Sequence, residues 1–264
     1  MTVSIAVTSG KGGVGKTNCA VNLSLCLTKM DKKVVLFDTD FGMANAHVLL
    51  GTNPKHTAAD FLRGNANLDD ILSDGPSGLR FIAGGSGLLE LLNLDNQARY
   101  QMLQSLAGLD GEIDYLVVDT PAGASESALF FAGAATIPLV VLVAEPTSFL
   151  DAYALIKASH IEKNINKFSV LVNMADGSAA ARKNFNKFFE ICRRFLDVNL
   201  HYAGMIPLSN AIRRSIVKRA PISIDQPTSP EAKAFLALAK EMTSAPVNTH
   251  DGIRFFHSDV EAKR

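Results

Sequence analysis

A glycine-rich stretch near the amino terminus has the residue types and spacing of a phosphate-binding loop. It lies between an apolar run at residues 3–7 and a helical pattern from residue 20, and it reads G-x-x-x-x-G-K-T. Glycines let the backbone turn its N–H groups toward an anion, and the N-terminus of the next helix adds positive potential. We expect Lys16 to contact the β- and γ-phosphates of a nucleotide and the Thr17 hydroxyl to bind Mg²⁺. A plain turn between strand and helix is the alternative, which the complete spacing disfavours. The expected binding residues are Gly10, Lys11, Gly12, Gly13, Val14, Gly15, Lys16 and Thr17.

Three aspartates at the ends of predicted strands add metal chemistry to this loop. Asp38 ends the apolar run 32–38 and Asp40 follows two residues later, whereas Asp119 ends the run 114–119. Parallel sheets place their ligands at the carboxyl ends of the strands, so we expect these carboxylates beside the loop. Such acids suit Mg²⁺ coordination or the orientation of a water molecule. Solvated loop acids are the alternative, and the neighbouring phosphate loop makes it the weaker one.

Alternating strands and helices are expected to position these residues. Apolar runs predict strands at 3–7, 32–38, 79–85, 114–119, 139–143, 168–173 and 202–207. Helical patterns occupy 57–62, 68–72, 97–109, 150–161, 182–196, 211–217 and 227–242. The order predicts an α/β fold, a single-domain P-loop NTPase with a predominantly parallel, doubly wound sheet flanked by helices. We assign residues 1–243 to this domain. Residues 244–264 are expected to be a detached tail, because Pro246, Asn248 and Gly252 disfavour a continuous helix.

Composition excludes several classes of protein. The 264 residues are 47% apolar and 20% charged, as in a globular chain. Lys plus Arg and Asp plus Glu are 26 each, so net charge gives no support to nucleic-acid or membrane binding. No apolar run approaches the ~20 residues of a membrane span, and because the first strand begins so early we do not expect a signal peptide. Cys19, Cys26 and Cys192 form no C-x-x-C pair, so we expect reduced, structural thiols in a cytoplasmic protein.

A second lysine in the loop, Lys11, exceeds what one phosphate site needs. The segment K-G-G-V-G-K-T at residues 11–17 resembles the deviant Walker A motif of the MinD/ParA ATPases. The resemblance implies that Lys11 reaches across a dimer interface to the partner's nucleotide; an ordinary surface lysine is the alternative. It further implies hydrolysis of Mg-ATP, with Lys11, Lys16 and Asp40 as the catalytic residues. Asp40 matches the acid that positions the attacking water. The implied metal-binding residues are Thr17, Asp38 and Asp119.

Two residues at the ends of later predicted strands resemble positions that contact the base in this family. Asn173 lies in a motif similar to V-N-x, and its amide has both a donor and an acceptor for the adenine edge. An asparagine in a strand-end turn is the alternative. Pro207 begins the loop that lies over the base in relatives. The segment 145–147 resembles the loop that borders the nucleotide.

Within the MinD/ParA group the chain is most similar to the flagellar-number regulators of the FleN/FlhG type. The supporting segments are 38–51 (DTDFGMANAHVLLG), 68–72, 211–217 and 252–256 (GIRFF). The resemblance implies an ATP-dependent homodimeric switch that regulates flagellar number or placement. Its implied partners are a flagellar transcription activator or a flagellar GTPase, and its implied location is the cytoplasm, the inner membrane or the cell pole. Since the chain starts on its first strand, a GTPase-stimulating N-terminal extension is not expected. Division-site positioning of the MinD type and DNA or cargo partitioning of the ParA type are the alternatives.

Two surfaces are candidates for such partners. Arg213, Arg214, Lys218 and Arg219 form a basic cluster suited to DNA, but we favour solvated cations on a helix that buries Ile212, Ile216 and Val217. The apolar tail residues Ile253, Phe255 and Phe256 suit contact with a membrane. Packing of this segment against the body of the protein is the equal alternative, since nearby acids oppose anionic lipid.

Overall fold

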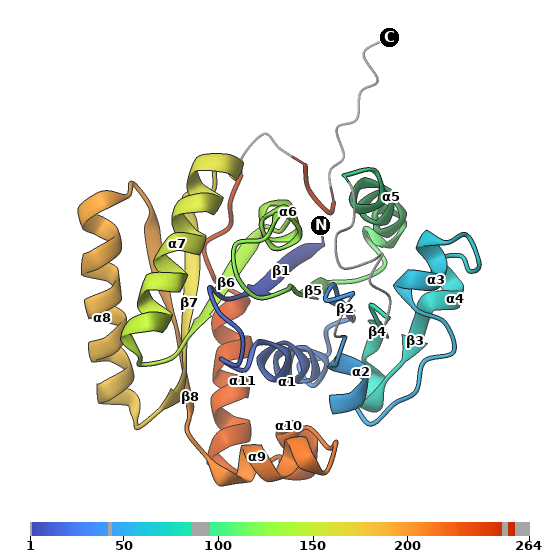
Figure 1. Cartoon of the computed structure of the whole chain (residues 1–264). Coiled ribbons are helices and arrows are strands. Elements are labelled where there is room, and N and C mark those ends of the chain that lie inside the picture. Colours follow the sequence, from blue (N-terminus) through green and yellow to red (C-terminus); the bar gives the residue numbers. More distant parts are fainter. Residues whose placement is uncertain (1, 42–43, 86–95, 250–252, 257–264) are drawn as a thin grey trace.

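Eight strands form one sheet at the centre of the fold (Figure 1). The computed structural model describes residues 2–41, 44–85, 96–249 and 253–256. The strands are β1 (Val3–Thr8), β2 (Val34–Asp38), β3 (Leu72–Asp74), β4 (Arg80–Ile82), β5 (Tyr115–Asp119), β6 (Ile137–Leu142), β7 (Lys167–Ala175) and β8 (Asn199–Pro207). Their order is β3-β4-β2-β5-β1-β6-β7-β8, and every pair is parallel except β3 with β4.

Helices cover both faces of this sheet. They are α1 (Lys16–Thr28), α2 (Ala46–Leu49), α3 (Ala58–Leu62), α4 (Leu68–Ile71), α5 (Asn96–Leu106), α6 (Glu126–Ala134), α7 (Pro146–Lys163), α8 (Ser178–Phe195), α9 (Asn210–Val217), α10 (Ile222–Asp225) and α11 (Pro230–Met242). One face packs on α1 and α11, with α2, α9 and α10 nearby, and the other packs on α5, α6, α7 and α8 (Figure 1). The predicted doubly wound α/β architecture is confirmed.

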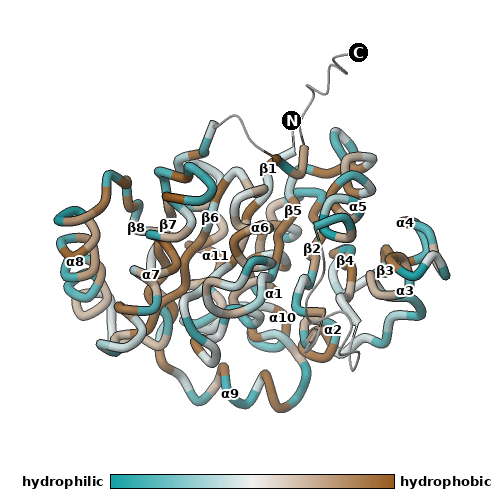
Figure 2. Tube along the Cα trace, turned by 45° about the horizontal axis from the view of Figure 1, so that its top comes forward, coloured by the Kyte–Doolittle hydropathy of each residue, from teal (hydrophilic) through white to brown (hydrophobic). Residues whose placement is uncertain are grey.

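The central strands are apolar on both sides because both faces are covered. In β1, Ile5 and Val7 belong to the cluster under α1, whereas Ala6 belongs to the cluster under α6. Figure 2 shows the same pattern as hydrophobic strands inside a mixed outer layer. The chain leaves β1 toward β2 on one side and leaves β5 toward β6 on the other, so its connections diverge around β1. Open α/β sheets bind ligands at such a point.

Four elements were not predicted: β3, α2, α6 and α10. Helix α6 shows best why a helix can be missed in the sequence, because its residues 127–134 are all buried and the helix is apolar all round. Such a helix shows no 3.6-residue alternation of apolar and polar positions, which is the signal on which the prediction depended. Helices α7 and α8 also begin about one turn earlier than expected.

The first part of the tail contradicts the expectation of a detached segment. Asn248 is buried, and its backbone N–H donates to the carbonyl oxygen of Thr136 at 2.9 Å. Its side-chain amide donates to the carbonyl oxygen of Lys167 at 2.9 Å and accepts from the Lys167 N–H at 3.1 Å. The amide therefore pairs like a strand residue beside β7, which a reading based on helix-breaking residues did not anticipate.

The second part of the tail also packs against the protein. Phe255 is fully buried, and its ring stacks on that of Phe131 with centroids 6.2 Å apart. Its N–H donates to the carbonyl oxygen of Ala134 at 3.1 Å, and Phe256 is 8% exposed. Because both side chains are buried, Phe255 and Phe256 are not exposed for the membrane contact considered above. The alternative, packing of this segment against the body of the protein, is correct. Ile253 is 42% exposed, and Gly252 lies outside the described residues.

No helix in the described ranges has both the length and the apolar character needed to span a membrane.

Candidate nucleotide-binding site

The phosphate loop connects β1 to α1 in the predicted place. Gly13 and Gly15 have φ angles of 79° and 88°, a region that L side chains rarely adopt. Gly15 is the N-cap of α1 and offers no side-chain cap, and the first turn of the helix has no acidic residue. Lys16 and Thr17 are the first two residues of α1. The free N–H groups of this turn and Lys16 therefore form one site suited to an anion.

A second turn is fastened to the start of this loop. Gly123, which follows β5, has a φ of 83°, and its N–H donates to the carbonyl oxygen of Ser9 at 2.9 Å. The Ser9 hydroxyl in turn donates to the carbonyl oxygen of Lys11 at 2.8 Å. These bonds join the turn after Asp119 to the phosphate loop, so the two sequence motifs form one unit.

Two of the predicted carboxylates lie side by side at the ends of neighbouring strands. Asp38 and Asp119 are register partners on β2 and β5, and both are buried. The carboxylate of Asp38 accepts backbone N–H bonds from Asp40 at 3.1 Å, Asn45 at 2.9 Å and Ala46 at 3.0 Å. Asp38 therefore holds the segment after β2 in place and keeps Asp40 at the carboxyl edge of the sheet.

Burial of these acids disfavours their charged forms. It raises the pKa of Asp38 to about 8 and the pKa of Asp119 to about 6, and the charge of Asp119 adds to the effect at Asp38. A hydrogen bond from the Thr17 side chain and the charge of Lys16 act in the opposite direction on the pKa of Asp119.

The same carboxylates suit a divalent cation. Oδ1 of Asp119 is buried and has no hydrogen-bond partner among the described residues. A lone carboxylate oxygen beside a threonine hydroxyl is a donor set that Mg²⁺ accepts, and a bound cation favours ionised acids. Thr17 and Asp119 therefore fit the predicted metal site, with Asp38 as its buried neighbour.

A pocket of about 350 Å³ adjoins the loop and contains both predicted base contacts. Asn173 and Pro207 line it, together with apolar side chains that include Met174 and Ile212. The Asn173 amide is buried and donates to the carbonyl oxygen of Val14 at 2.6 Å. One of its two N–H groups thus supports the phosphate loop, and the pocket has the apolar walls that suit a planar base.

Lys11 does not extend away from its own chain. Its ammonium group lies 2.5 Å from Oε2 of Glu145 and 3.2 Å from Oγ1 of Thr147, at the start of α7. The side chains of Lys11 and Glu145 are 30% and 59% exposed, so the pair lies at the rim of the site. Sequence reasoning placed residues 145–147 near the nucleotide but missed this pairing, because only a resemblance pointed to that loop.

The basic cluster on α9 differs from the expected solvated helix. Ile212 is buried as expected, but Ile216 is 39% exposed and Val217 is 84% exposed. Ile216 and Arg213 line the pocket beside the phosphate loop. Nζ of Lys218 lies 3.5 Å from Oδ2 of Asp225. The apolar face of α9 thus points partly into an open pocket, so burial could not be inferred from its periodicity.

Comparisons with known proteins agree with this geometry. The family model described as the CobQ/CobB/MinD/ParA nucleotide binding domain matches residues 5–222. The chain is 41% identical to the antiactivator FleN of Pseudomonas aeruginosa, covering 96% of this chain and 91% of FleN. It is 33% identical to the flagellum site-determining protein YlxH of Helicobacter pylori, covering 81% and 73%. The structure of the septum site-determining protein MinD of Pyrococcus horikoshii, complexed with Mg-ADP, has a TM-score of 0.76, 25% identity and coverage of 92% and 96%.

Proposed function

This chain belongs to the CobQ/CobB/MinD/ParA nucleotide-binding family, and we propose that it is an ATP-hydrolysing, dimerising switch that regulates flagellar number or placement. The similarity to FleN and YlxH supports the flagellar role. We propose a regulatory protein of the flagellar system as its partner, either a transcription activator or a GTPase. A peripheral membrane contact is left out of the proposal, because Phe255 and Phe256 are buried.

The observation that carries the switch is the placement of two lysines on one phosphate loop. Lys16 begins α1 at the anion site, whereas Lys11 lies at the rim and is 30% exposed. A phosphate site within one subunit uses only the first of them. We propose that the second, Lys11, leaves Glu145 and contacts a nucleotide held by another copy of the chain.

The chemistry proposed for this site is transfer of the γ-phosphoryl group of ATP to water. Lys16 and the N–H groups of the first turn of α1 would bind the phosphates, and Asp40 would orient the attacking water. Thr17 and Asp119 would hold Mg²⁺, which when bound offsets the negative charge of the phosphates. Asp38 fixes the segment that contains Asp40 through its three backbone hydrogen bonds.

The dimer can be tested by measuring the mass of the full chain in ATP. We expect the wild type to dimerise transiently and Asp40→Ala to accumulate as an ATP-bound dimer, since it binds ATP without cleaving it. Lys11→Ala is expected to bind ATP and stay monomeric. Light scattering after size exclusion gives the mass, with ADP as the control nucleotide. An ATP-bound Asp40→Ala protein that remains monomeric would falsify the switch.

The flagellar role needs a separate measurement in cells. We expect deletion of the gene in its own organism to change the number or position of flagella seen by electron microscopy. The wild-type gene should restore the count, and Asp40→Ala should not. Unchanged flagella in the deletion strain, together with a defect in division or plasmid retention, would move the assignment to the MinD-type or ParA-type alternative.

Glu145 is expected to hold back dimerisation by binding Lys11 within one subunit. Replacing Glu145 with glutamine removes the ion pair. Because an exposed ion pair contributes about 1 kcal/mol or less, we expect Glu145→Gln to dimerise at a two- to fivefold lower ATP concentration than the wild type. The matched control is Glu190→Gln, because Glu190 is also 59% exposed and pairs with Arg193 at 2.9 Å. A higher ATP requirement for Glu145→Gln would show instead that Glu145 stabilises the assembled dimer.

A further inference from the structure

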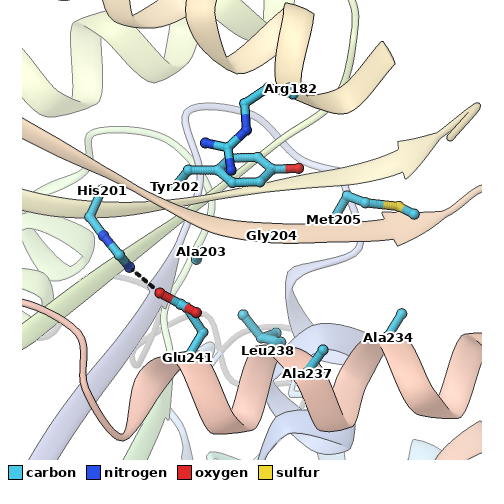
Figure 3. A pocket seen from close by; sticks show the side chains of 10 residues that line it. All are labelled: Arg182, His201, Tyr202, Ala203, Gly204, Met205, Ala234, Ala237, Leu238 and Glu241. Carbon is cyan, nitrogen blue, oxygen red and sulfur yellow. Dashed lines mark ion pairs between the residues drawn. The ribbon is translucent and has the colours of Figure 1, made fainter. Parts of the chain in front are cut away.

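A groove of about 410 Å³ lies at one edge of the sheet, along β8 (Figure 3). Strand β8 pairs with β7 on one side, and among the described residues no strand pairs with its other side. Arg182 of α8 and Tyr202 of β8 lie on one side of the strand, and the side chains of α11 face it from the other. The groove therefore combines free main-chain groups of an edge strand with two side-chain walls.

The wall formed by Arg182 and Tyr202 presents a guanidinium group that stacks on an aromatic ring but has no carboxylate partner among the described residues. The Arg182 guanidinium lies 3.8 Å from the centre of the Tyr202 ring, and this ring packs on Phe185 with centroids 5.0 Å apart. Arg182 is exposed, and the described part of the chain gives its N–H groups no carboxylate or carbonyl partner. Stacking fixes the plane of a guanidinium while leaving its N–H groups free for a carboxylate.

The opposite side of the groove, which faces α11, leaves room for an extended chain to enter. Ala234 and Ala237 of α11 are small, and Gly204 of β8 has no side chain and a φ of 115°. At one end, Nε2 of His201 lies 2.9 Å from Oε1 of Glu241 and closes the groove. A strand beside β8 would alternate its side chains between the Arg182 side and the alanine side.

We propose that this groove binds an extended segment of a protein partner, which pairs with the free edge of β8 and places an acidic side chain on Arg182. The unpaired main-chain groups favour an extended backbone as occupant, and the unpaired cation favours an acid. The register between β7 and β8 shifts after Tyr202, and Pro207 has no N–H, so regular pairing extends over a few residues only. The occupant is accordingly short. The proposal goes beyond the nucleotide switch and does not depend on it.

The test uses defined peptides and the full chain without nucleotide, so that its outcome is separate from that of the switch. We would titrate a capped heptapeptide of alternating valine and glutamate and follow the backbone amide signals of residues 199–206 by NMR. We expect saturable shifts there and at least about fivefold weaker binding when glutamine replaces glutamate. A peptide N-methylated at alternate residues should not bind, since it cannot pair with β8.

Three variants assign the contacts. Arg182→Gln should bind the acidic peptide no better than the neutral one, whereas Arg193→Gln, the matched control on the same helix, should bind it as the wild type does. Ala237→Arg, at an exposed position, should block all the peptides. Equal binding of the N-methylated peptide or unmoved β8 signals would overturn the proposal. So would a dimer that forms without ATP or peptide and is lost in Ala237→Arg, because a second copy would then occupy the groove.

Discussion

A Lys16→Ala protein is expected to lose nearly all ATP binding and turnover while keeping its fold. Lys16 is the first residue of α1, where the free N–H groups of the helix converge, and its charge acts on buried Asp119. Without it, the anion site keeps its dipoles but loses the lysine whose charge acts on Asp119, and Lys11 is held at the rim by Glu145. Loss of one such charged contact lowers turnover by about 10²–10³-fold.

Nucleotide binding and phosphate release would be measured side by side for Lys16→Ala and Lys11→Ala. The second variant is the control for loss of a lysine from the same loop: it should keep ATP binding, which Lys16→Ala loses, but fail to dimerise and therefore also lose turnover. Chemical unfolding without nucleotide should give Lys16→Ala a free energy of unfolding within about 0.5 kcal/mol of the wild type. Turnover by Lys16→Ala within threefold of the wild type would contradict the assigned phosphate site.

The site could be predicted from local motifs, because each motif is a short segment of sequence at the end of one strand. The phosphate loop, Asp38, Asp40 and Asp119 could be placed together, since parallel strands bring their carboxyl ends to one edge. The structure puts Asp38 and Asp119 in register on adjacent strands. The sheet class followed in the same way from apolar runs alternating with helical patterns.

Contacts between distant segments could not be predicted in this way. Lys11 and Glu145 are 134 positions apart, and an ion pair at the rim leaves no pattern in the sequence. The burial of Phe255 against Phe131 is similar, because an apolar cluster in a tail fits a membrane, a partner or the chain's own core equally well. The orientation of Ile216 depended on a pocket that only the packed fold creates.

Gly10→Ala is expected to cost about 3 kcal/mol or more of the free energy of unfolding, although a strand-to-helix loop usually tolerates alanine. A Cβ at Gly10 would lie 2.1 Å from the carbonyl carbon of Asp151 and 2.4 Å from the backbone nitrogen of Ala152. Both atoms belong to the backbone of α7, so no side chain can rotate away. The helix or the loop must move, and overpacking of this severity exceeds the usual 1–3 kcal/mol range.

Gly12→Ala is the matched control, because it adds the same methyl group two residues further along the same loop. No heavy atom lies within 4 Å of a Cβ at Gly12, and its backbone is not in the left-handed region. We expect its unfolding free energy to stay within about 1 kcal/mol of the wild type. Urea unfolding without nucleotide compares the two variants directly, since neither result then depends on ATP. Equal midpoints would show that α7 is not packed on Gly10. A low midpoint for Gly10→Ala alone would show that the start of α7, and with it Glu145 and Thr147, is fixed in place by the phosphate loop.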